Sequence, residues 1–212
     1  MIVYGSSLSP FVRKTLAFAA EKGIEVEVKP VGPNSPDPDF AACSPLRKMP
    51  AFRDGDFTVS DSSAIIAYLD AKFPELPLVP TEAKGRARAI WYEEFADTIL
   101  CACMGKMFFN RLAAPRFLGR KGDLAAADKA EREELPPLID YIERVIPASG
   151  FLVEDRLTLA DLAVASPFVN FQHLGVGMDR GKHPRTAAFI ESIHARPSFA
   201  RLIAKEKAFL AR

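Results

Sequence analysis

Three serines and a proline gather near the N-terminus, between a short apolar run and a charged helical pattern. Ser9 is followed by Pro10, a residue that is favoured in the first turn of a helix. A hydroxyl at this position can accept a backbone N–H as a helix cap, or it can donate to an anion that the helix end also stabilises. Ser6 and Ser7 offer the same chemistry, so the residues alone leave both the role and the serine open.

The residues around these serines predict alternating strands and helices. Strands are expected over 1–4 and 25–31, helices over 10–22, 38–43 and 61–73, and a loop over 32–38. Asp54-Gly55-Asp56 is a hairpin signal that joins expected strands over 51–53 and 57–59. The resulting order, β-α-β-α-β-β-α, is that of the thioredoxin fold, whose chemistry takes place at the first strand-to-helix turn.

The rest of the chain predicts helices alone. The stretch "PELPLVP" at 74–80 holds three prolines and indicates an extended linker. Helical patterns follow over 86–111, 124–145, 158–173, 184–195 and 198–210, and Pro136-Pro137 should kink or break the second of them. We therefore expect a thioredoxin-like α/β domain over 1–75, a linker over 76–84 and an all-α helical-bundle domain over 85–212.

The stretch "LTLAD" at 157–161 predicts how one of these helices begins. Thr158 suits the N-cap, and Asp161 stands three residues later, where its carboxylate can accept the N–H of the N-cap residue. Because the helix around it is otherwise apolar, we expect Asp161 to serve as part of this cap.

The composition narrows the classes of function. Lys and Arg number 28 and Asp and Glu 27, a net charge of +1, so the chain lacks the basic excess of a nucleic-acid-binding protein. No stretch has the length of a membrane span, and no signal peptide is visible. The three cysteines form no CxxC pair and the three histidines lack metal-ligand spacing. These features favour a reduced, cytoplasmic protein without a metal site.

The first turn differs from that of a redox protein. A dithiol enzyme of the thioredoxin fold carries C-P-x-C there, whereas this chain has Ser9-Pro10-Phe11-Val12. Ser9 stands in place of the nucleophilic cysteine and Val12 in place of its partner, so dithiol–disulfide chemistry is lost. What remains is a hydroxyl at a helix N-terminus, which can donate to a sulfur anion supplied by another molecule.

Four motifs occur in order along the chain: "SPFVRK" at 9–14, "RKMPAF" at 47–52, "VSDSSAIIAYL" at 59–69 and "LTLADLAVA" at 157–165. With them the sequence resembles the soluble, cytosolic-type glutathione S-transferases, above all the serine-using classes such as the tau and zeta types and many bacterial proteins. The resemblance implies a homodimeric detoxification enzyme with glutathione as co-substrate. It places the catalytic hydroxyl on Ser9, with Ser6 and Ser7 as alternatives and a plain helix cap as the other interpretation of Ser9.

The resemblance also implies a set of glutathione-binding residues. They are Phe11, Lys48, Met49, Pro50, Asp61 and Ser62. A cis Met49–Pro50 bond would present the Met49 backbone to the cysteinyl part of glutathione, and Lys48 would reach the glycine carboxylate. Asp61 suits the γ-glutamyl ammonium and Ser62 the γ-glutamyl carboxylate. The alternatives are a solvated lysine at 48 and ordinary first-turn residues at 61 and 62.

The second substrate of such an enzyme would be a small apolar electrophile. Residues expected to line its site are Tyr4, Cys101, Met104, Met107 and Phe108, and for each of them core packing is the alternative. In some relatives an acidic residue reaches the glutathione ammonium across the dimer, and Asp97 would do so here.

Three kinds of function share this scaffold. The sequence favours a transferase that adds the glutathione thiolate to an apolar electrophile, because Ser9 occurs together with Asp61 and Ser62. A specialised glutathione-dependent isomerase, dehalogenase or ether-cleaving enzyme would carry the same residues. A non-catalytic binding protein on the same scaffold is the third alternative.

Overall fold

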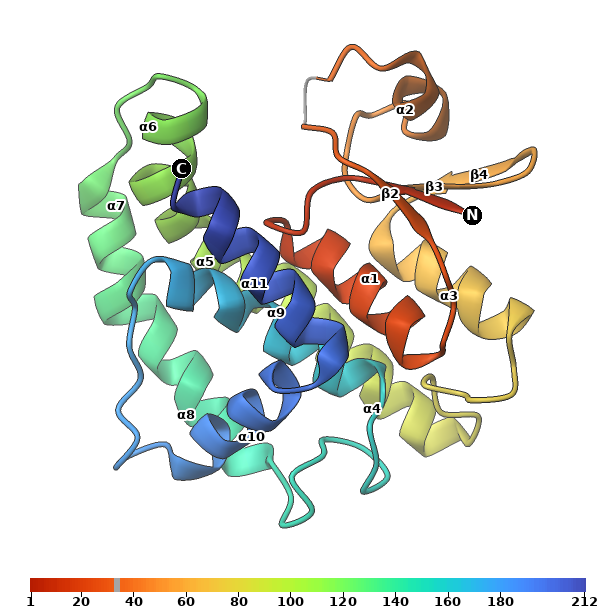
Figure 1. Ribbon diagram of the computed structural model, residues 1–212. Helices are drawn as coiled ribbons and strands as arrows, with labels where there is room; N and C mark the ends of the chain where they lie inside the picture. Colours follow the sequence, from red (N-terminus) through yellow and green to blue (C-terminus); the bar gives the residue numbers. More distant parts are fainter. Residues whose placement is uncertain (33–34) are drawn as a thin grey trace. The chain divides into compact units, whose positions relative to one another are not determined.

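The computed structural model describes residues 1–32 and 35–212, so Pro33 and Asn34 of the expected loop lie outside the described residues. The chain forms two compact units. The first comprises residues 1–81 together with 196–212, and the second comprises residues 82–195. Figure 1 shows the elements of each unit.

A four-stranded sheet in the order β2-β1-β3-β4 forms the centre of the first unit. The strands are β1 (Ile2–Tyr4), β2 (Glu27–Lys29), β3 (Ala51–Asp54) and β4 (Phe57–Ser60). β1 pairs with β2 in parallel and with β3 in antiparallel orientation, and β3 continues into β4 as the predicted hairpin. A parallel pair followed by an antiparallel hairpin confirms the expected thioredoxin-like arrangement.

Helices cover both faces of this sheet. They are α1 (Pro10–Glu21), α2 (Pro38–Cys43) and α3 (Ser62–Lys72), and a further helix of this unit, α11 (Pro197–Leu210), packs against α1. Figure 1 shows α1 and α3 on one face of the sheet and α2 on the other. Tyr4 lies on the α2 side, in a buried cluster with Phe40 and Cys43. Successive side chains of a strand point to opposite faces, so Val3 faces the other way.

The helix α11 belongs to the first unit, whereas we expected the residues from 85 to 212 to form one helical domain. The reason is a pair of ionic contacts between α1 and the residues of α11. Arg13 is bonded to Glu206, and Glu21 is bonded to Arg196, which precedes α11 directly. Contacts between residues so far apart in the chain leave no local sequence pattern.

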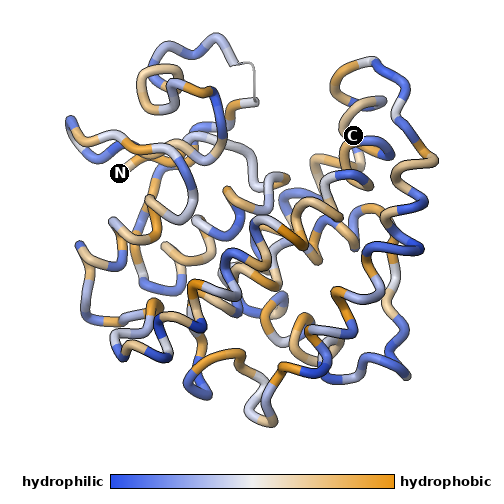
Figure 2. The backbone as a smooth tube through the Cα atoms, turned by 180° about the vertical axis from the view of Figure 1, so that it is seen from behind, coloured by the Kyte–Doolittle hydropathy of each residue, from blue (hydrophilic) through white to orange (hydrophobic). Residues whose placement is uncertain are grey.

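The second unit is helical, as predicted. Its elements are α4 (Ala83–Glu94), η1 (Phe95–Leu100), α5 (Cys101–Phe108), η2 (Phe109–Ala113), α6 (Ala114–Phe117), α7 (Leu124–Lys129), η3 (Ala130–Glu134), α8 (Leu135–Val145), α9 (Leu159–His173) and α10 (Pro184–His194). The segments η1, η2 and η3 are turns of π-helix that join successive α-helices. Figure 2 shows hydrophobic and hydrophilic segments alternating along the chain, as expected for amphipathic helices such as α8, in which Leu135, Ile139 and Ile142 are buried.

The prolines at 136 and 137 lie in the first turn of α8. There the missing N–H groups are tolerated because a wider turn precedes them, in which the Leu135 N–H donates to the Ala130 carbonyl. The predicted interruption is therefore a turn of π-helix. In the described part of the chain, no helix is long and apolar enough to cross a membrane.

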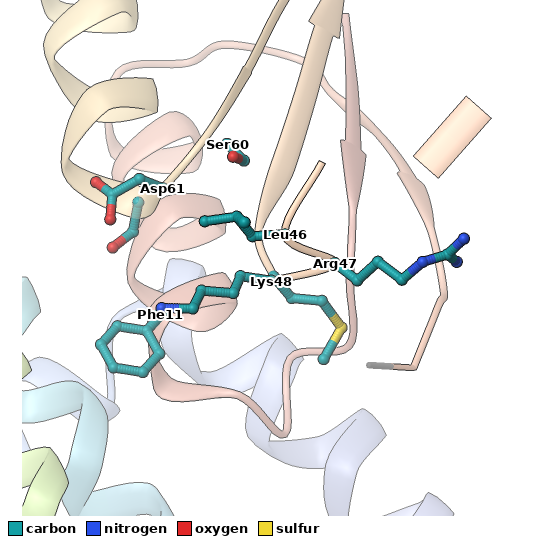
Figure 3. Close-up of a pocket in the computed structure, with 8 residues that line it drawn as sticks. Phe11, Leu46, Arg47, Lys48, Ser60 and Asp61 are labelled. Atoms are coloured by element: carbon teal, nitrogen blue, oxygen red, sulfur yellow. The ribbon is translucent and has the colours of Figure 1, made fainter. Parts of the chain in front are cut away.

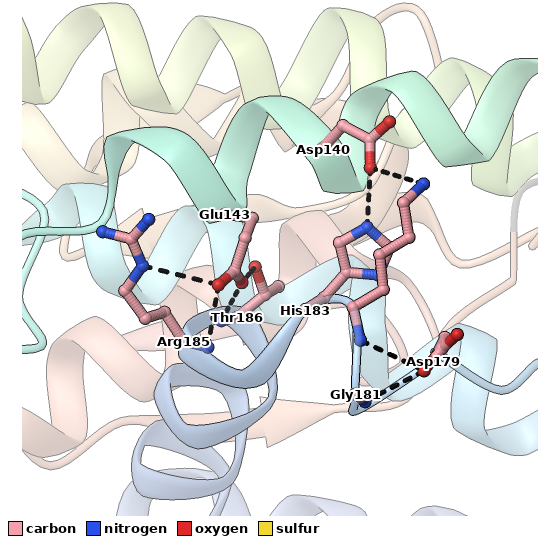
Figure 4. A network of polar contacts seen from close by, with 8 residues as sticks. Asp140, Glu143, Asp179, Gly181, His183, Arg185 and Thr186 are labelled. Atoms are coloured by element: carbon pink, nitrogen blue, oxygen red, sulfur yellow. Dashed lines mark hydrogen bonds and ion pairs between the residues drawn. The ribbon is translucent and has the colours of Figure 1, made fainter.

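Polar contacts join α8 to the start of α10 within the second unit (Figure 4). The Glu143 carboxylate accepts the N–H groups of Arg185 and Thr186 at 3.1 and 2.8 Å, and the Thr186 hydroxyl at 2.7 Å. One turn earlier on α8, an oxygen of Asp140 lies 2.6 Å from Nε2 of His183. Burial opposes ionisation of Glu143, but the hydrogen bonds hold its pKa below the ordinary value. Glu143 thus caps α10 from a neighbouring helix.

Candidate active site

The turn between β1 and α1 presents a free hydroxyl. Ser9 is the N-cap residue of α1, with an extended backbone (φ −75°, ψ 126°), and its N–H donates to the Ser6 carbonyl at 2.9 Å. Its side chain makes no capping hydrogen bond. The hydroxyl also has no hydrogen-bond partner among the residues that the structure describes. The cap position is therefore occupied by Ser9, but its hydroxyl does not act as a cap.

The N-terminal turn of α1 also offers backbone donors. Pro10 has no N–H, and the Arg13 N–H donates to the Ser9 carbonyl at 3.0 Å. The N–H groups of Phe11 and Val12 lie in the first turn, where helical N–H groups lack an intrahelical partner. An anion beside the Ser9 hydroxyl would therefore meet the positive end of the helix dipole as well.

Gly5 allows the end of β1 to come close to α1. Its φ is +150°, and a Cβ at this position would lie 2.6 Å from a methyl group of Val12. A side chain at position 5 would therefore clash, and glycine is also the residue that tolerates this backbone conformation. This close approach packs the end of β1 against the first turn of α1.

A second segment, the loop before β3, carries two cations. The buried hydroxyl of Ser44 accepts the Lys48 N–H and donates to the Lys48 carbonyl, both at 2.9 Å, which shapes this loop. The Arg47 guanidinium donates to the Ser35 carbonyl at 2.7 Å. The Met49–Pro50 peptide bond that follows is cis, as predicted. Among residues 1–32 and 35–212, none forms a hydrogen bond with the Met49 N–H or carbonyl group.

The third segment is the start of α3. Asp61 has a φ of +98°, an uncommon conformation for a residue with a side chain, and its N–H donates to the Pro50 carbonyl at 3.2 Å. Its Oδ1 caps the helix by accepting the N–H groups of Ser63 and Ala64 at 2.9 and 3.1 Å. Such backbone strain persists only where surrounding contacts enforce it, and it is frequent at ligand sites. Ser62 beside it is buried.

These segments enclose a pocket of about 660 Å³ in the first unit. Its lining residues are Phe11, Leu46, Arg47, Lys48, Met49, Ser60, Asp61 and Ser62. Figure 3 shows the Lys48 side chain extending toward Phe11, whereas Arg47 points away from Asp61. The pocket thus has a carboxylate at the start of α3 and a cation from the loop before β3. Such a distribution of charge suits a ligand that carries both an ammonium and carboxylates.

Most of the residues predicted to bind glutathione line this pocket. They are Phe11, Lys48, Met49, Asp61 and Ser62. Pro50 is buried next to Met49, and Ser9 lies two residues before Phe11 without forming part of the pocket wall. Sequence reasoning missed Leu46, Arg47 and Ser60. Arg47 and Ser60 each adjoin a predicted residue, and Ser60 also pairs with Ala51 at the start of β3.

Tyr4 differs from its predicted role. We expected it to line the second-substrate site, but it is fully buried and its ring lies 6.4 Å from that of Phe40. Burial raises the pKa of its phenol. Its place in the core of the first unit argues against contact with a substrate. The other predicted lining residues are on α5 in the second unit, where Cys101, Met104 and Met107 are buried.

Comparisons with known proteins agree with this arrangement. The family model for the glutathione S-transferase N-terminal domain matches residues 3–77, and the model for the C-terminal domain matches residues 115–206. A solved structure of glutathione S-transferase III in its apo form is 30% identical, with a TM-score of 0.78, and the alignment covers 96% of this chain and 95% of that one. The chain belongs to the glutathione S-transferase family.

The curated relatives of this chain include both transferases and a protein with a different name. It is 29% identical to Glutathione S-transferase 3 of Zea mays over 209 residues, which cover 95% of this chain and 92% of the relative. It is 35% identical to Elongation factor 1-gamma of Schizosaccharomyces pombe over 162 residues, which cover 76% of this chain and 38% of that protein. The scaffold of this transferase family thus also occurs in a protein that is not named as a transferase.

Proposed function

We propose that this protein is a glutathione transferase in which the Ser9 hydroxyl donates to the sulfur of glutathione and stabilises the thiolate. The observation that carries the proposal is the Ser9 side chain itself. It stands at the N-terminus of α1, forms no capping hydrogen bond, and lies two residues before a wall of the pocket. A hydroxyl that is not used by the fold is available to a ligand.

The charges of the pocket suit the two ends of glutathione. At the γ-glutamyl end, the Asp61 oxygen that does not cap α3 faces the ammonium, and the hydroxyl and N–H of Ser62 bind the carboxylate. At the other end, Lys48 pairs with the glycine carboxylate. Between them, the Met49 N–H and carbonyl pair with the cysteinyl backbone as a short added strand would.

The energies of these interactions are sufficient for the chemistry. A free thiol has a pKa near ~8.5, so only a small fraction is thiolate in a neutral solution. Lowering this value by about two units requires roughly 2.7 kcal/mol. One hydrogen bond to a charged group contributes about 1.5–3 kcal/mol, and the helix dipole adds about 0.3–1 kcal/mol. The Ser9 hydroxyl and the α1 N-terminus together reach the required magnitude.

The reaction that follows is nucleophilic attack by sulfur. The thiolate lone pair forms a bond to an electrophilic carbon of a small apolar substrate, and the electrons of the broken bond leave with the departing group or move onto the acceptor. Ser9 keeps the sulfur ionised until this step. Phe108, the half-buried residue among those predicted on α5, is our candidate for contact with that substrate. A homodimer, with Asp97 at the partner's glutathione, is part of the same proposal.

The test of this function is the Ser9→Ala variant. We expect it to bind glutathione, but the pKa of the bound sulfur should rise and the thiolate population at neutral pH should fall by roughly one to two decades. Thiolate absorbance as a function of pH measures the first effect, and turnover with a panel of electrophiles measures the second. Wild-type conjugation by Ser9→Ala between pH 6 and 9 would reject the role of Ser9 and turn attention to Ser6 and Ser7.

A non-catalytic function is the second candidate, because the chain is also similar to Elongation factor 1-gamma. Retention on immobilised glutathione without turnover of any electrophile would favour it. The same panel separates a general transferase from a specialised one if it includes isomerisable, halogenated and ether substrates. Selective turnover of one of these three classes would identify the specialised enzyme.

A further inference from the structure

The helix α1 is bonded to α11 through a fully buried ion pair. Arg13 and Glu206 are 0% and 2% exposed. The Arg13 Nε donates to Oε1 of Glu206 at 3.0 Å, and one of its terminal nitrogens donates to Oε2 at 2.8 Å. Two parallel hydrogen bonds between planar groups determine the orientation of both side chains as well as their distance.

A second ion pair joins the other end of α1 to the start of α11. The Glu21 carboxylate accepts two hydrogen bonds from the Arg196 guanidinium, at 2.8 and 2.7 Å, and a third from the Ser198 hydroxyl. Arg13 and Glu21 lie ~12 Å apart along α1 at the usual helical rise. The start of α1 is thus paired with the second half of α11, and the end of α1 with the residue before α11. The helices therefore run in opposite directions and are held at two points.

The pair nearer the active site lies one turn from the proposed catalytic hydroxyl. The Arg13 N–H donates to the Ser9 carbonyl at 3.0 Å, so a rotation of α1 at Arg13 would move Ser9 and Phe11 with it. Figure 1 shows α1 leading from the strand β1 directly into this region of contact with α11. The orientation of the N-terminal turn thus depends on a residue 193 positions away in the chain.

A buried ion pair is a poor device for stability alone. Bringing both charges out of water is costly, and apolar residues of similar size often serve equally well. What a bidentate pair adds is direction. We propose that Arg13 and Glu206 are positioning residues that orient the first turn of α1, so that the Ser9 hydroxyl and the helix N-terminus face the glutathione sulfur. This inference rests on the proposed function.

The test replaces the ionic contact by an apolar one. In the double variant Arg13→Met with Glu206→Met, the side chains can still fill the space, but the directional contact is lost. We expect a folded protein in which the pKa of bound glutathione rises by about one unit, which is a tenfold loss of thiolate below that pKa. Its affinity for S-methylglutathione, which has no thiol to ionise, should change less than twofold. Arg13→Lys keeps the charge without the planar fork, so its effect should be intermediate.

The matched control is Thr158→Ala, a substitution in the second unit that lowers stability without touching α1. It should leave the pKa of the bound sulfur unchanged. A double variant with the wild-type sulfur pKa would overturn the inference, because the pair would then be structural only. If the double variant does not fold, the comparison of Arg13→Lys with the control decides in the same way.

A separate measurement tests the role of the ion pair independently of the proposed role of Ser9. If wild-type protein leaves the glutathione pKa at its free value, the role of Ser9 fails. Amide hydrogen exchange of residues 9–18, measured in the protein without glutathione, then tests whether Arg13 and Glu206 hold the first turn of α1 in place. Faster exchange of this segment in the double variant, with unchanged exchange in α3, supports the inference. Equal exchange in wild type and variant overturns it.

Discussion

Asp61 combines two tasks in one carboxylate. Its Oδ1 accepts two N–H groups at the start of α3, while the residue is exposed and lines the pocket beside Ser62. An amide at this position could still cap the helix, because its oxygen accepts the same hydrogen bonds. It could not pair with an ammonium as a charge. The cap and the ligand contact are therefore separable by a single substitution.

We predict that Asp61→Asn keeps the fold but weakens glutathione binding roughly tenfold to a hundredfold, the range expected for losing a hydrogen bond between charged groups. Isothermal titration measures this loss. A glutathione analogue without the γ-glutamyl amine serves as the control ligand, and its affinity should change little. Equal losses for the two ligands would assign Asp61 a structural role only.

Individual residues differ in how well their places could be predicted. The cis bond before Pro50 and the pocket positions of Lys48 and Asp61 were predicted from the resemblance of short motifs to a known family, because a proline by itself leaves the trans bond favoured. Tyr4 does not follow in this way. Strand alternation predicts that Val3 and Tyr4 face opposite sides of the sheet, but it does not show which side α2 covers.

At the scale of secondary-structure elements, a buried carboxylate, that of Asp161, caps the start of α9. The Asp161 carboxylate accepts the Thr158 N–H at 2.8 Å, the Thr158 hydroxyl at 3.1 Å and the Leu152 N–H at 2.8 Å. These contacts confirm the predicted capping role of Asp161. Burial nevertheless raises its pKa from 3.8 to about 6, against the opposing effect of the hydrogen bonds.

This raised pKa makes stability depend on pH in a specific direction. Because folded Asp161 binds its proton more tightly than the unfolded chain does, its contribution is complete below pH ~3.8 and is lost as the pH rises through about 6. We predict that the free energy of unfolding of wild type falls by roughly 3 kcal/mol relative to Asp161→Asn across this window. Urea unfolding at intervals between pH 3.5 and 7 measures the difference. Parallel pH curves for the two proteins would contradict the prediction.

The elements themselves could be predicted better than their grouping. Proline, glycine and capping residues indicate most helix and strand ends, since these signals act within a few residues. The π-helical turns and the placement of α11 in the first unit have no such signal. Arg13 and Lys14 in "SPFVRK" look like solvated helix charges, and only the fold shows that both are buried.

On the scale of the whole molecule, the first unit depends on residues that follow the second unit in the chain. Beyond Lys205, Glu206 is buried, whereas Lys207, Ala208 and Phe209 are exposed. Two shortened chains therefore form a matched pair. A chain that ends at Phe209 keeps the partner of Arg13, and a chain that ends at Lys205 removes it.

We predict that the chain ending at Lys205 loses about 3–5 kcal/mol of unfolding free energy, the cost of leaving a buried charge without its partner. The chain ending at Phe209 should stay close to wild type. Thermal unfolding of the two chains checks this difference. Arg13→Met should restore much of the stability of the shorter chain, because it removes the buried charge that has lost its ion pair with Glu206. Equal unfolding temperatures for both shortened chains would show that Glu206 contributes nothing to the first unit.

The discontinuous first unit also has a consequence for synthesis on the ribosome. Its sheet and α1 emerge first, but residues 196–212 emerge only after the whole second unit has been made. An N-terminal domain ordinarily can fold while the rest of the chain is still being translated. Here α1 must wait for Arg196 and Glu206 before both of its ion pairs can form. A product that stops within the second unit would therefore carry Ser9 without the contacts that orient its turn, so completion of translation through α11 precedes assembly of the site.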